Sequence, residues 1–580
     1  AGLPLSFAVS VRREGGGGKG VKGPSKRMFK ALSSAFTRGP DLKADIIDAG
    51  VELKNSKLPW KVHEGKQKDN GKPATIFSFE LTPATTDAAA TAARNALRRL
   101  KKLRHPSLLL FIDGSEPPAD AKTGKVLIVT EHVTPLTTWL ASRPDQGDEA
   151  TSRGLAGLCK ALHFLHYDCN QVHLNVVIPS VFVDKAGDWK LGGMELAMEK
   201  EAATSNGLKP LQPLLVRRFM PPEVVRDNSQ ADRVAHSIDI WSVGCLMHEV
   251  YVGELASPEG LKDTRGLPKE LIPLYQSTLK SNPAQRPTGK DLSQNQALET
   301  DGVWVCNAMS ELTLKDAAEK QKLLEEIHQR IERLPFPLLQ YKVLPELLKS
   351  LEFGGAGTSA MAPILKIGQK LTPEDFAKDI VPGVVRCFGS QDRATRFGLL
   401  QNLHTFAQHL TPQLVEKDIY PAVATGFTDT VPGMRELSLM SMVHLVPKLS
   451  DKIVNSQVLR AMAILQSDSE GSIRCNTTIC MGKIAQYISP STRDKVLLQS
   501  LSRSLQDPFP PSRIAALLSL SATLVHFQAQ DVARKLVPAI ASLTLDGEKQ
   551  VREQAVSTLR NAVTKLEEAS VKMSEELMQA

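Results

Sequence analysis

The chain has 580 residues, of which 42% are hydrophobic and 23% are charged. These proportions are typical of globular proteins, and the length allows two or more domains, so a wholly disordered or fibrous chain is excluded. The formal net charge is +8, but residues 1–43 carry nine Lys or Arg and two acids, which leaves +1 for the rest. A near-neutral body with a basic segment argues against a folded basic domain that binds nucleic acid.

Residues 1–45 are predicted to form a disordered basic arm, because a run of like charges is most often a solvated tail. The seven cysteines, an odd number without regular spacing, indicate a reducing compartment rather than a disulfide framework. No run of about 20 apolar residues occurs, so no segment is expected to cross a bilayer.

The region 46–300 is interpreted as one domain that opens with short β-like runs. These runs lie at 58–65, 74–81, 108–114 and 125–133, and a helical run at 88–103 separates the second from the third. Mostly helical segments follow. This order of elements is similar to that of a two-lobed α+β protein kinase.

Five motifs carry the resemblance to protein kinases. RHPSLL at 104–109 matches the segment after the regulatory helix. VHLNVVIPSVFVDKAGDWKLGG at 172–193 matches the catalytic loop and the strands that lead to the metal site. PPE at 221–223, SIDIWSVGCLMHEV at 237–250 and NPAQRPT at 282–288 match the APE motif, the buried helix of the large lobe and the late Arg element.

The residues that hold the large lobe of a kinase together are present. In kinases the Glu of the APE motif pairs with the late Arg, and the matching residues here are Glu223 and Arg286. Asp239 matches the buried-helix Asp that supports the catalytic loop, and His173 matches the packing histidine of the HRD motif. The resemblance therefore implies a retained kinase fold.

The residues that perform phosphoryl transfer are replaced. The reaction needs a strand Lys on the phosphates, a helix Glu that orients it, a catalytic Asp, and an Asn and an Asp on Mg²⁺. The matching positions, in the same order, are Phe77, Ala96, Asn175, Ser180 and Gly193. The Gly-rich loop is reduced to Gly65, and Gly71 is read as an Asn-Gly hairpin turn.

These replacements predict a pseudokinase with no catalytic residue, no cofactor and no metal. A triphosphate carries about four negative charges and Mg²⁺ prefers hard oxygen ligands, so an apolar cleft desolvates both at a large cost. Glu195, two residues after the DFG Asp position, is the one candidate for a substitute metal ligand. A weak ATP binder that uses Glu195 therefore remains an alternative.

The region 301–570 contains a repeat of constant length. Arg396, Arg435, Arg474, Arg513 and Arg552 follow one another at intervals of 39 residues. An Asp precedes each of the last four by six residues, namely Asp429, Asp468, Asp507 and Asp546. Residues 571–580 are expected to form a tail.

Each repeat reads as an apolar helix, a turn with the Asp, and a second apolar helix that contains the Arg. The Asp carboxylate is expected to accept backbone N–H groups beside the second helix. The Arg can reach the Asp of its own or of a neighbouring repeat, which would fix the stacking register. Pro382, Pro421 and Pro538 are expected near the start of the first helix, where the missing N–H costs little. A period near 40 predicts an all-α HEAT-repeat solenoid, a fold that commonly binds proteins on its long curved surface.

Taken together, the two regions resemble the N-terminal kinase-like (Scyl-type) pseudokinases, which join a degenerate kinase domain to HEAT repeats. GDWKLGG at 187–193, LEFGGAG at 351–357 and RCNTTICMGKI at 474–484 are particularly close to family sequences. The resemblance implies a non-enzymatic scaffold in Golgi-to-ER retrograde vesicle traffic. It also implies a cytoplasmic protein, peripheral on Golgi or vesicle membranes, whose partners are coatomer-type or clathrin-type coats, adaptors and small GTPases.

The alternative from another functional class is an adaptor for nuclear export of tRNA. Family precedent and the basic residues 12–43 favour it. The near-neutral body, which lacks basic stripes with interleaved aromatic residues, weighs against strong RNA contact.

Overall fold

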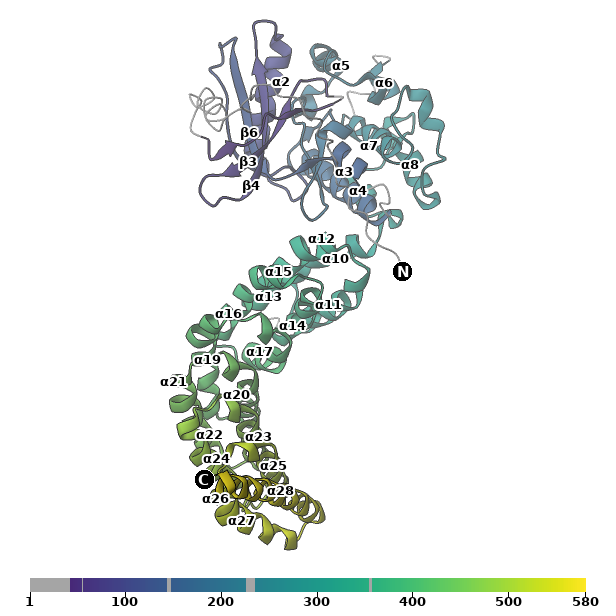
Figure 1. Ribbon diagram of the computed structural model, residues 1–580. Helices are drawn as coiled ribbons and strands as arrows, with labels where there is room; N and C mark the ends of the chain where they lie inside the picture. Colours follow the sequence, from purple (N-terminus) through teal and green to yellow (C-terminus); the bar gives the residue numbers. More distant parts are fainter. Residues whose placement is uncertain (1–41, 55, 143–147, 226–234, 354–356, 580) are drawn as a thin grey trace, which may run out of the picture. The chain divides into compact units, whose positions relative to one another are not determined.

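A computed structural model describes residues 42–54, 56–142, 148–225, 235–353 and 357–579. The predicted basic arm up to residue 41 lies outside these ranges. The described residues divide into two compact units (Figure 1). Unit 1 comprises the described residues of Ala1–Ser142, Leu158–Asp184 and Lys190–Lys290; unit 2 comprises the described residues of Arg143–Gly157, Lys185–Trp189 and Asp291–Ala580.

Unit 1 begins with an antiparallel sheet of the order β1-β3-β4-β6-β5, with β2 also paired to β3. The strands are β1 (Ala44–Ile46), β2 (Val51–Glu52), β3 (Lys61–Gln67), β4 (Pro73–Leu81), β5 (Phe111–Ser115) and β6 (Gly124–Glu131). Because Ala44 already pairs with Gln67 in the sheet, the predicted arm boundary at residue 45 is too far along the chain. The four predicted runs correspond to β3, β4, β5 and β6.

Helix α2 (Asp87–Lys102) packs on β5 and β6 of this sheet. Thr86 caps it by accepting the Ala89 N–H, and basic residues in the last turn favour its C-terminal end. Its alanine-rich face is buried, so the helix backbone approaches the sheet closely. Ala96 of this face lines the same cavity as Phe77 of β4.

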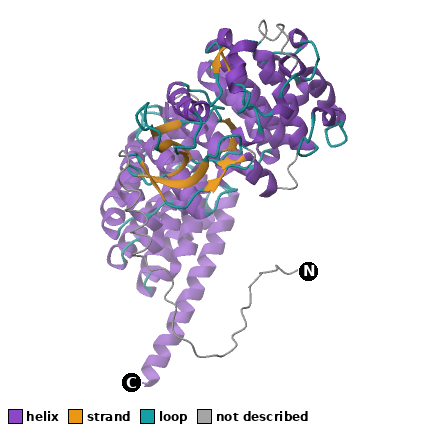
Figure 2. Cartoon of the chain, turned by 90° about the horizontal axis from the view of Figure 1, so that it is seen from above, coloured by secondary structure: helices purple, strands orange, loops and turns teal. Residues whose placement is uncertain are grey.

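The rest of unit 1 is mainly helical. In Figure 2 most of the orange strands lie together in one part of unit 1, and purple helices make up most of the remainder. The buried helix α7 (His236–Tyr251) has apolar or small residues on every side, as a core helix requires. The other elements between residues 134 and 293, of which α4, β10 and α9 are each divided between the two units, are β7 (Thr134–Pro135), α3 (Leu136–Ser142), α4 (Asp148–His163), β8 (Gln171–Val172), β9 (Val181–Val183), β10 (Trp189–Leu191), β11 (Met198–Glu199), α5 (Ser205–Leu208), α6 (Pro222–Val225), α8 (Ile272–Thr278) and α9 (Gly289–Ser293).

Unit 2 is a stack of helices over residues 291–579. Its helices are α10 (Asp301–Glu311), α11 (Ala317–Arg330), α12 (Phe336–Leu338), α13 (Leu344–Phe353), α14 (Met361–Gly368), α15 (Pro373–Asp379), α16 (Val381–Phe388), α17 (Arg393–Phe406), α18 (Pro412–Leu414), α19 (Tyr420–Ala424), α20 (Pro432–Leu445), α21 (Asp451–Ile453), α22 (Leu459–Leu465), α23 (Gly471–Ile484), α24 (Pro490–Ser504), α25 (Pro510–Thr523), α26 (Ala529–Asp531), α27 (Val537–Ser542) and α28 (Lys549–Gln579). Residues 571–579, predicted as a tail, continue helix α28.

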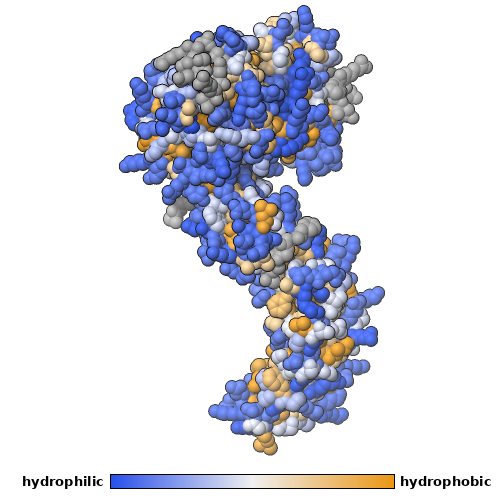
Figure 3. Space-filling model, turned by 180° about the vertical axis from the view of Figure 1, so that it is seen from behind, coloured by the Kyte–Doolittle hydropathy of each residue, from blue (hydrophilic) through white to orange (hydrophobic). Residues whose placement is uncertain are grey.

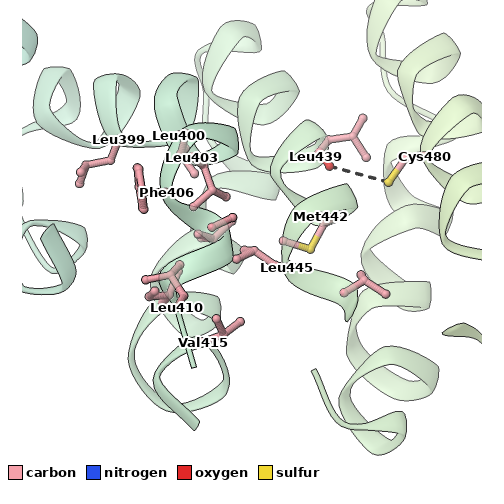
Figure 4. Close-up of a cluster of buried hydrophobic side chains, with 14 of the residues drawn as sticks. Leu399, Leu400, Leu403, Phe406, Leu410, Val415, Leu439, Met442, Leu445 and Cys480 are labelled. Atoms are coloured by element: carbon pink, nitrogen blue, oxygen red, sulfur yellow. Dashed lines mark hydrogen bonds between the residues drawn. The ribbon is translucent and has the colours of Figure 1, made fainter. Parts of the chain in front are cut away.

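The second helices of the five repeats, which we call the B helices, are α17, α20, α23, α25 and α28. Each packs on the next, and one continuous hydrophobic core runs from Val305 to Ala562. Figure 4 shows part of this core, where Leu399, Leu403 and Phe406 lie on one face of α17. The Cys480 thiol of α23 reaches the carbonyl of Leu439 on α20 at 3.8 Å. The predicted fold class, a two-lobed kinase-like fold followed by an α-solenoid, is confirmed.

The prolines of the first helices lie in the first turn of α16, α19 and α27, as predicted for Pro382, Pro421 and Pro538. Helices α19 and α27 continue directly from the π-helical turns Val415–Ile419 and Val532–Leu536, so Pro421 and Pro538 also lie inside longer helical runs. A proline ring clashes with the carbonyl four residues back in an α-helix. A π turn widens the backbone at this point, so the run continues through the proline.

Candidate functional site

The five replaced positions of the kinase chemistry lie together. Phe77 of β4, Ala96 of α2, Asn175, Ser180 and Gly193 all line one cavity of unit 1. The space left among these side chains is about 30 Å³. By this measure the cavity has room for about two water molecules.

The wall that faces a triphosphate in an active kinase is apolar here. The ring of Phe77 packs edge-to-face on Phe182, with 5.1 Å between ring centroids. Leu100, Leu109 and Ile128 complete this side of the cavity. The described residues that line the cavity include no Lys or Arg, so they offer no side-chain cation to a phosphate.

The backbone at Gly193 excludes a larger residue at the DFG Asp position. Gly193 has a φ of +66°, and a Cβ atom there would lie 2.3 Å from the Ser180 hydroxyl. Asn175 donates from Nδ2 to the Gly193 carbonyl at 3.2 Å. Ser180 and Asn175 therefore both lie against Gly193, where the metal-binding Asp of a kinase would need room for its side chain.

Glu195, the candidate substitute ligand, is buried in the same cavity. Burial raises the pKa of its carboxyl, although Asn175 donates to Oε2 at 3.1 Å. Burial therefore disfavours the ionised carboxylate that Mg²⁺ needs as a ligand. Within the described ranges, no group of three or more His, Cys, Asp or Glu side chains could hold a metal ion.

The sequence analysis placed the phosphate loop wrongly. Gly65 is paired inside β3, opposite Ala74 of β4 and Ile46 of β1, so it belongs to a strand. In a kinase-like sheet the Gly-rich loop joins the first two paired strands, and here that connection is 53–60, LKNSKLPW, which has no glycine. Strands β1 and β2 are too short and polar to be recognised from sequence.

The connection 53–60 fills the cleft, a feature that the sequence analysis missed. Leu53, Ser56 and Trp60 line the cavity, and Trp60 is 2% exposed. Its indole packs on Phe79 of β4, with 5.4 Å between ring centroids. The indole N–H lies near the Glu195 carboxyl and partly offsets the rise in its pKa, although the two groups do not meet the geometry of a hydrogen bond. An aromatic ring thus occupies space beneath the loop that covers phosphates in active kinases.

The predicted structural pair of the large lobe is in contact. Arg286 donates from Nη1 and Nη2 to the two carboxylate oxygens of Glu223, at 2.6 and 2.9 Å. It also donates to the carbonyls of Ser237 and Lys280, and its guanidinium lies 4.9 Å from the Trp241 ring. Both charged residues are buried. The hydrogen bonds of Arg286 satisfy most of its donors, as a buried ion pair requires.

Asp239 of α7 is fully buried beneath the former catalytic loop. It accepts the backbone N–H groups of His173 and Leu174, each at 2.7 Å, and the Nε2–H of His166 at 2.8 Å. Burial alone would raise the pKa of Asp239, but these hydrogen bonds and the nearby histidines lower it. His173 donates from Nε2 to the Gly192 carbonyl at 2.8 Å. The loop is therefore fixed although it carries no catalytic Asp.

The predicted repeat residues form a ladder that links neighbouring repeats. Three ion pairs form the ladder: Arg435 with Asp468, Arg474 with Asp507, and Arg513 with Asp546. In each pair the Nε and Nη2 atoms of the Arg lie about 2.7–2.9 Å from the two carboxylate oxygens of the Asp. The Nη1 group of each Arg donates to the carbonyl of the Asp in its own repeat. The partner carboxylate is thus always in the next repeat.

The two ends of the ladder differ from its middle. Arg396 donates to the Thr425 hydroxyl and the Ala422 carbonyl, while Arg393 pairs with Asp429 at 3.3 Å. Arg552 donates only to the carbonyls of Asp546 and Gly547 in the described part of the chain. Each repeat Asp also accepts an N–H two residues on, as Asp507 does from Phe509 at 2.8 Å.

Comparison with known proteins agrees with this geometry. The family model described as "Protein kinase domain" matches residues 61–298. The "Probable inactive serine/threonine-protein kinase scy1" of Dictyostelium discoideum is 31% identical over 510 residues, which cover 88% of this chain and 61% of that protein. The chain has a protein kinase domain and is homologous to Scy1-type probable inactive kinases over most of its length.

Other Scy1-type relatives match over similar lengths. The "Protein kinase domain-containing protein ppk3" of Schizosaccharomyces pombe is 26% identical over 513 residues, 86% of this chain and 78% of that protein. "SCY1-like protein 2" of Homo sapiens is 20% identical over 630 residues, 94% of this chain and 64% of that protein. The chain spans about three fifths of the Dictyostelium relative, whose printed name describes an inactive kinase.

A solved structure supports the fold of this chain. The "Crystal structure of Cex1p" aligns with a TM-score of 0.56 and 21% identity, and covers 91% of this chain and 97% of that one. At this identity the match establishes the fold alone. None of the described helices is both long and apolar enough to cross a bilayer.

Proposed function

We propose that this chain is a catalytically inactive, kinase-like scaffold that gathers coat and adaptor proteins in vesicle traffic between Golgi and ER. The observation that carries the proposal is the cleft. It keeps the surrounding kinase framework of Asp239, Glu223 and Arg286, while Phe77 and Trp60 fill the space beside the phosphate position. A framework kept without its chemistry is consistent with a docking role.

The solenoid supplies a surface that suits such a scaffold. Met440, Ile479 and Leu518 are exposed and lie 39 residues apart on α20, α23 and α25. Since successive B helices pack side by side, these three positions form a row, which we call the apolar row. Figure 3 shows that hydrophobic residues reach the surface of the all-helical part on the face that it displays. Protein-binding solenoids commonly use such repeated surface positions.

Mg-ATP is expected to leave the thermal unfolding midpoint of the chain unchanged. The described residues that line the cavity include no side-chain cation for phosphate, and burial raises the pKa of Glu195, which disfavours its ionised form. Differential scanning fluorimetry tests this expectation, because a ligand at 100 times its dissociation constant would stabilise the fold by about 2.7 kcal/mol. A clear, Mg²⁺-dependent rise of the midpoint would contradict the inactive-scaffold proposal.

Replacing two residues of the apolar row is expected to weaken partner capture at least about tenfold, because buried apolar anchors dominate protein interfaces. The variant is Ile479→Asp with Leu518→Asp. The control is Leu314→Asp with Leu545→Asp, which changes two residues that are more exposed and lie outside the row. Affinity purification from cytosol with quantitative mass spectrometry measures the capture.

The same purification separates the trafficking role from the alternative role with tRNA. Enrichment of coat, adaptor or small-GTPase components by the wild-type chain, lost in the row variant alone, supports the proposal. Absence of these components speaks against it. Enrichment of tRNA instead, lost at high salt or without residues 1–43, favours the tRNA adaptor.

A further inference from the structure

The last B helix, α28, presents a face that is covered in every preceding repeat with the same register. Val556 of α28 is 38% exposed, whereas Leu439, Thr478 and Leu517 at the matching positions are 0% exposed. Val563 is 43% exposed, whereas Val446, Ala485 and Leu524 at the matching positions are 1%, 2% and 6% exposed. In those repeats the next B helix packs on the B helix of the repeat. We call the face around Arg552, Val556 and Val563 the end face.

The ladder independently marks the same face as open. In Arg435, Arg474 and Arg513, Nη1 donates to a carbonyl in the turn of the same repeat. Their Nε and Nη2 groups face the Asp carboxylate of the next repeat. Arg552 makes the Nη1 contacts, but the described residues supply no carboxylate to its Nε and Nη2 edge. A guanidinium edge in this geometry recognises a carboxylate through two parallel hydrogen bonds.

Side chains across each B-helix junction show what the end face is shaped to receive. Ser519 of α25 donates to the Thr478 carbonyl at 3.3 Å, and Thr558 of α28 donates to the Leu517 carbonyl at 3.3 Å. The covering element is thus a helix that packs closely enough to bond with the backbone. In each case that helix follows an Asp turn which occupies the Arg edge.

We propose that the end face binds a partner protein through an amphipathic helix adjoining a turn that carries an aspartate. The apolar part of that helix covers Val556 and Val563, and its Asp pairs with the open edge of Arg552. This interaction is separate from the apolar row and the cleft, so it does not rest on the trafficking role.

A second copy of the chain lacks the required group. All four repeat-turn carboxylates are already held by arginines of the same chain, since Asp429 pairs with Arg393 and the other three form the ladder. The first repeat has Ser390 at the corresponding position. Head-to-tail stacking of two copies would therefore leave Arg552 without a carboxylate, which favours a partner that brings its own Asp.

A peptide taken from the chain itself is a suitable probe, because it already performs this contact one repeat earlier. Residues 543–566 contain the Asp546 turn, which binds Arg513, and the first part of α28, which packs on α25. A fluorescein-labelled peptide of this sequence is titrated with the full chain, and anisotropy gives the dissociation constant. The control peptide carries Asp546→Asn.

Wild-type chain is expected to bind the peptide, and either Arg552→Gln in the chain or Asp546→Asn in the peptide is expected to weaken binding about tenfold. Arg560→Gln is the matched control, since Arg560 is exposed on the same helix, and it is expected to change nothing. Val563→Asp gives a second variant that leaves the Nη1 contacts of Arg552 in place. Melting followed by circular dichroism checks that the variants remain folded.

Three results would overturn the proposal. The wild-type chain fails to bind the peptide, Arg552→Gln and Val563→Asp both bind it as tightly as Arg560→Gln does, or the control peptide binds equally well. Sedimentation velocity tests the remaining occupant. Self-association of the wild-type chain that Arg552→Gln abolishes would replace the partner protein with a second copy.

Discussion

Arg286→Ala is expected to lower the free energy of unfolding of unit 1 by about 3–5 kcal/mol, because the change leaves a buried charge without its partner. Among the described residues, Arg286 is the only cation that forms an ion pair with Glu223. It also donates hydrogen bonds to the carbonyls of Ser237 and Lys280. Trp241 lies 4.9 Å from the guanidinium, so tryptophan fluorescence during urea unfolding reports on this region.

Arg265→Ala is the matched control for this prediction. Arg265 also forms a bidentate pair, with Asp263, but its side chain is 90% exposed. An exposed pair contributes about 0–1 kcal/mol, so the urea midpoint is expected to change little. Equal midpoints for Arg286→Ala and Arg265→Ala would show that the buried pair does not hold the large lobe together.

Trp60→Ala is expected to destabilise unit 1 by about 3–5 kcal/mol, as is typical when a buried aromatic side chain is truncated. Trp60 packs on Phe79 and closes the cavity beside Glu195, so the variant enlarges the space in the cleft. The enlarged cleft is still expected not to bind Mg-ATP, because Phe77 and Gly193 remain where Lys and Asp are needed. Thermal unfolding with and without Mg-ATP measures both effects.

Trp139→Ala separates loss of stability from opening of the cleft. Trp139 is also largely buried, but it lies on α3 and does not line the cavity. It should destabilise the fold without changing the cavity. Suppose that Mg-ATP raises the midpoint of Trp60→Ala but not that of Trp139→Ala. The Trp60 indole alone would then exclude nucleotide, and the replaced kinase positions would not be enough to prevent binding.

The sequence was informative where a pattern has a fixed spacing. The 39-residue interval of the arginines predicted the repeat, and the motifs around Asp239, Glu223 and Arg286 predicted the large lobe. The five replaced positions were chosen by resemblance, and the structure brings all of them to one cavity. Residue spacing predicted these features because each of them requires particular residues at fixed distances along the chain.

Features that depend on packing were not readable in this way. Trp60 looked like part of a strand, and only the pairing of β2 with β3 shows that it ends the loop over the cleft. The direction of each ladder contact was left open, because an Arg one turn into a helix can reach either neighbouring Asp. The π turns before Pro421 and Pro538 depend on a backbone adjustment that no single residue type specifies.

The ladder has a consequence for how the solenoid can vary in length. Each complete rung joins an Arg to an Asp 33 residues further on, and the same spacing recurs in every 39-residue repeat. Removal or duplication of one whole repeat therefore rebuilds every remaining rung with identical partners. A deletion of a few residues more or fewer breaks the rung at the cut and turns the following helices out of phase, so inherited changes in length are expected to come in whole repeats.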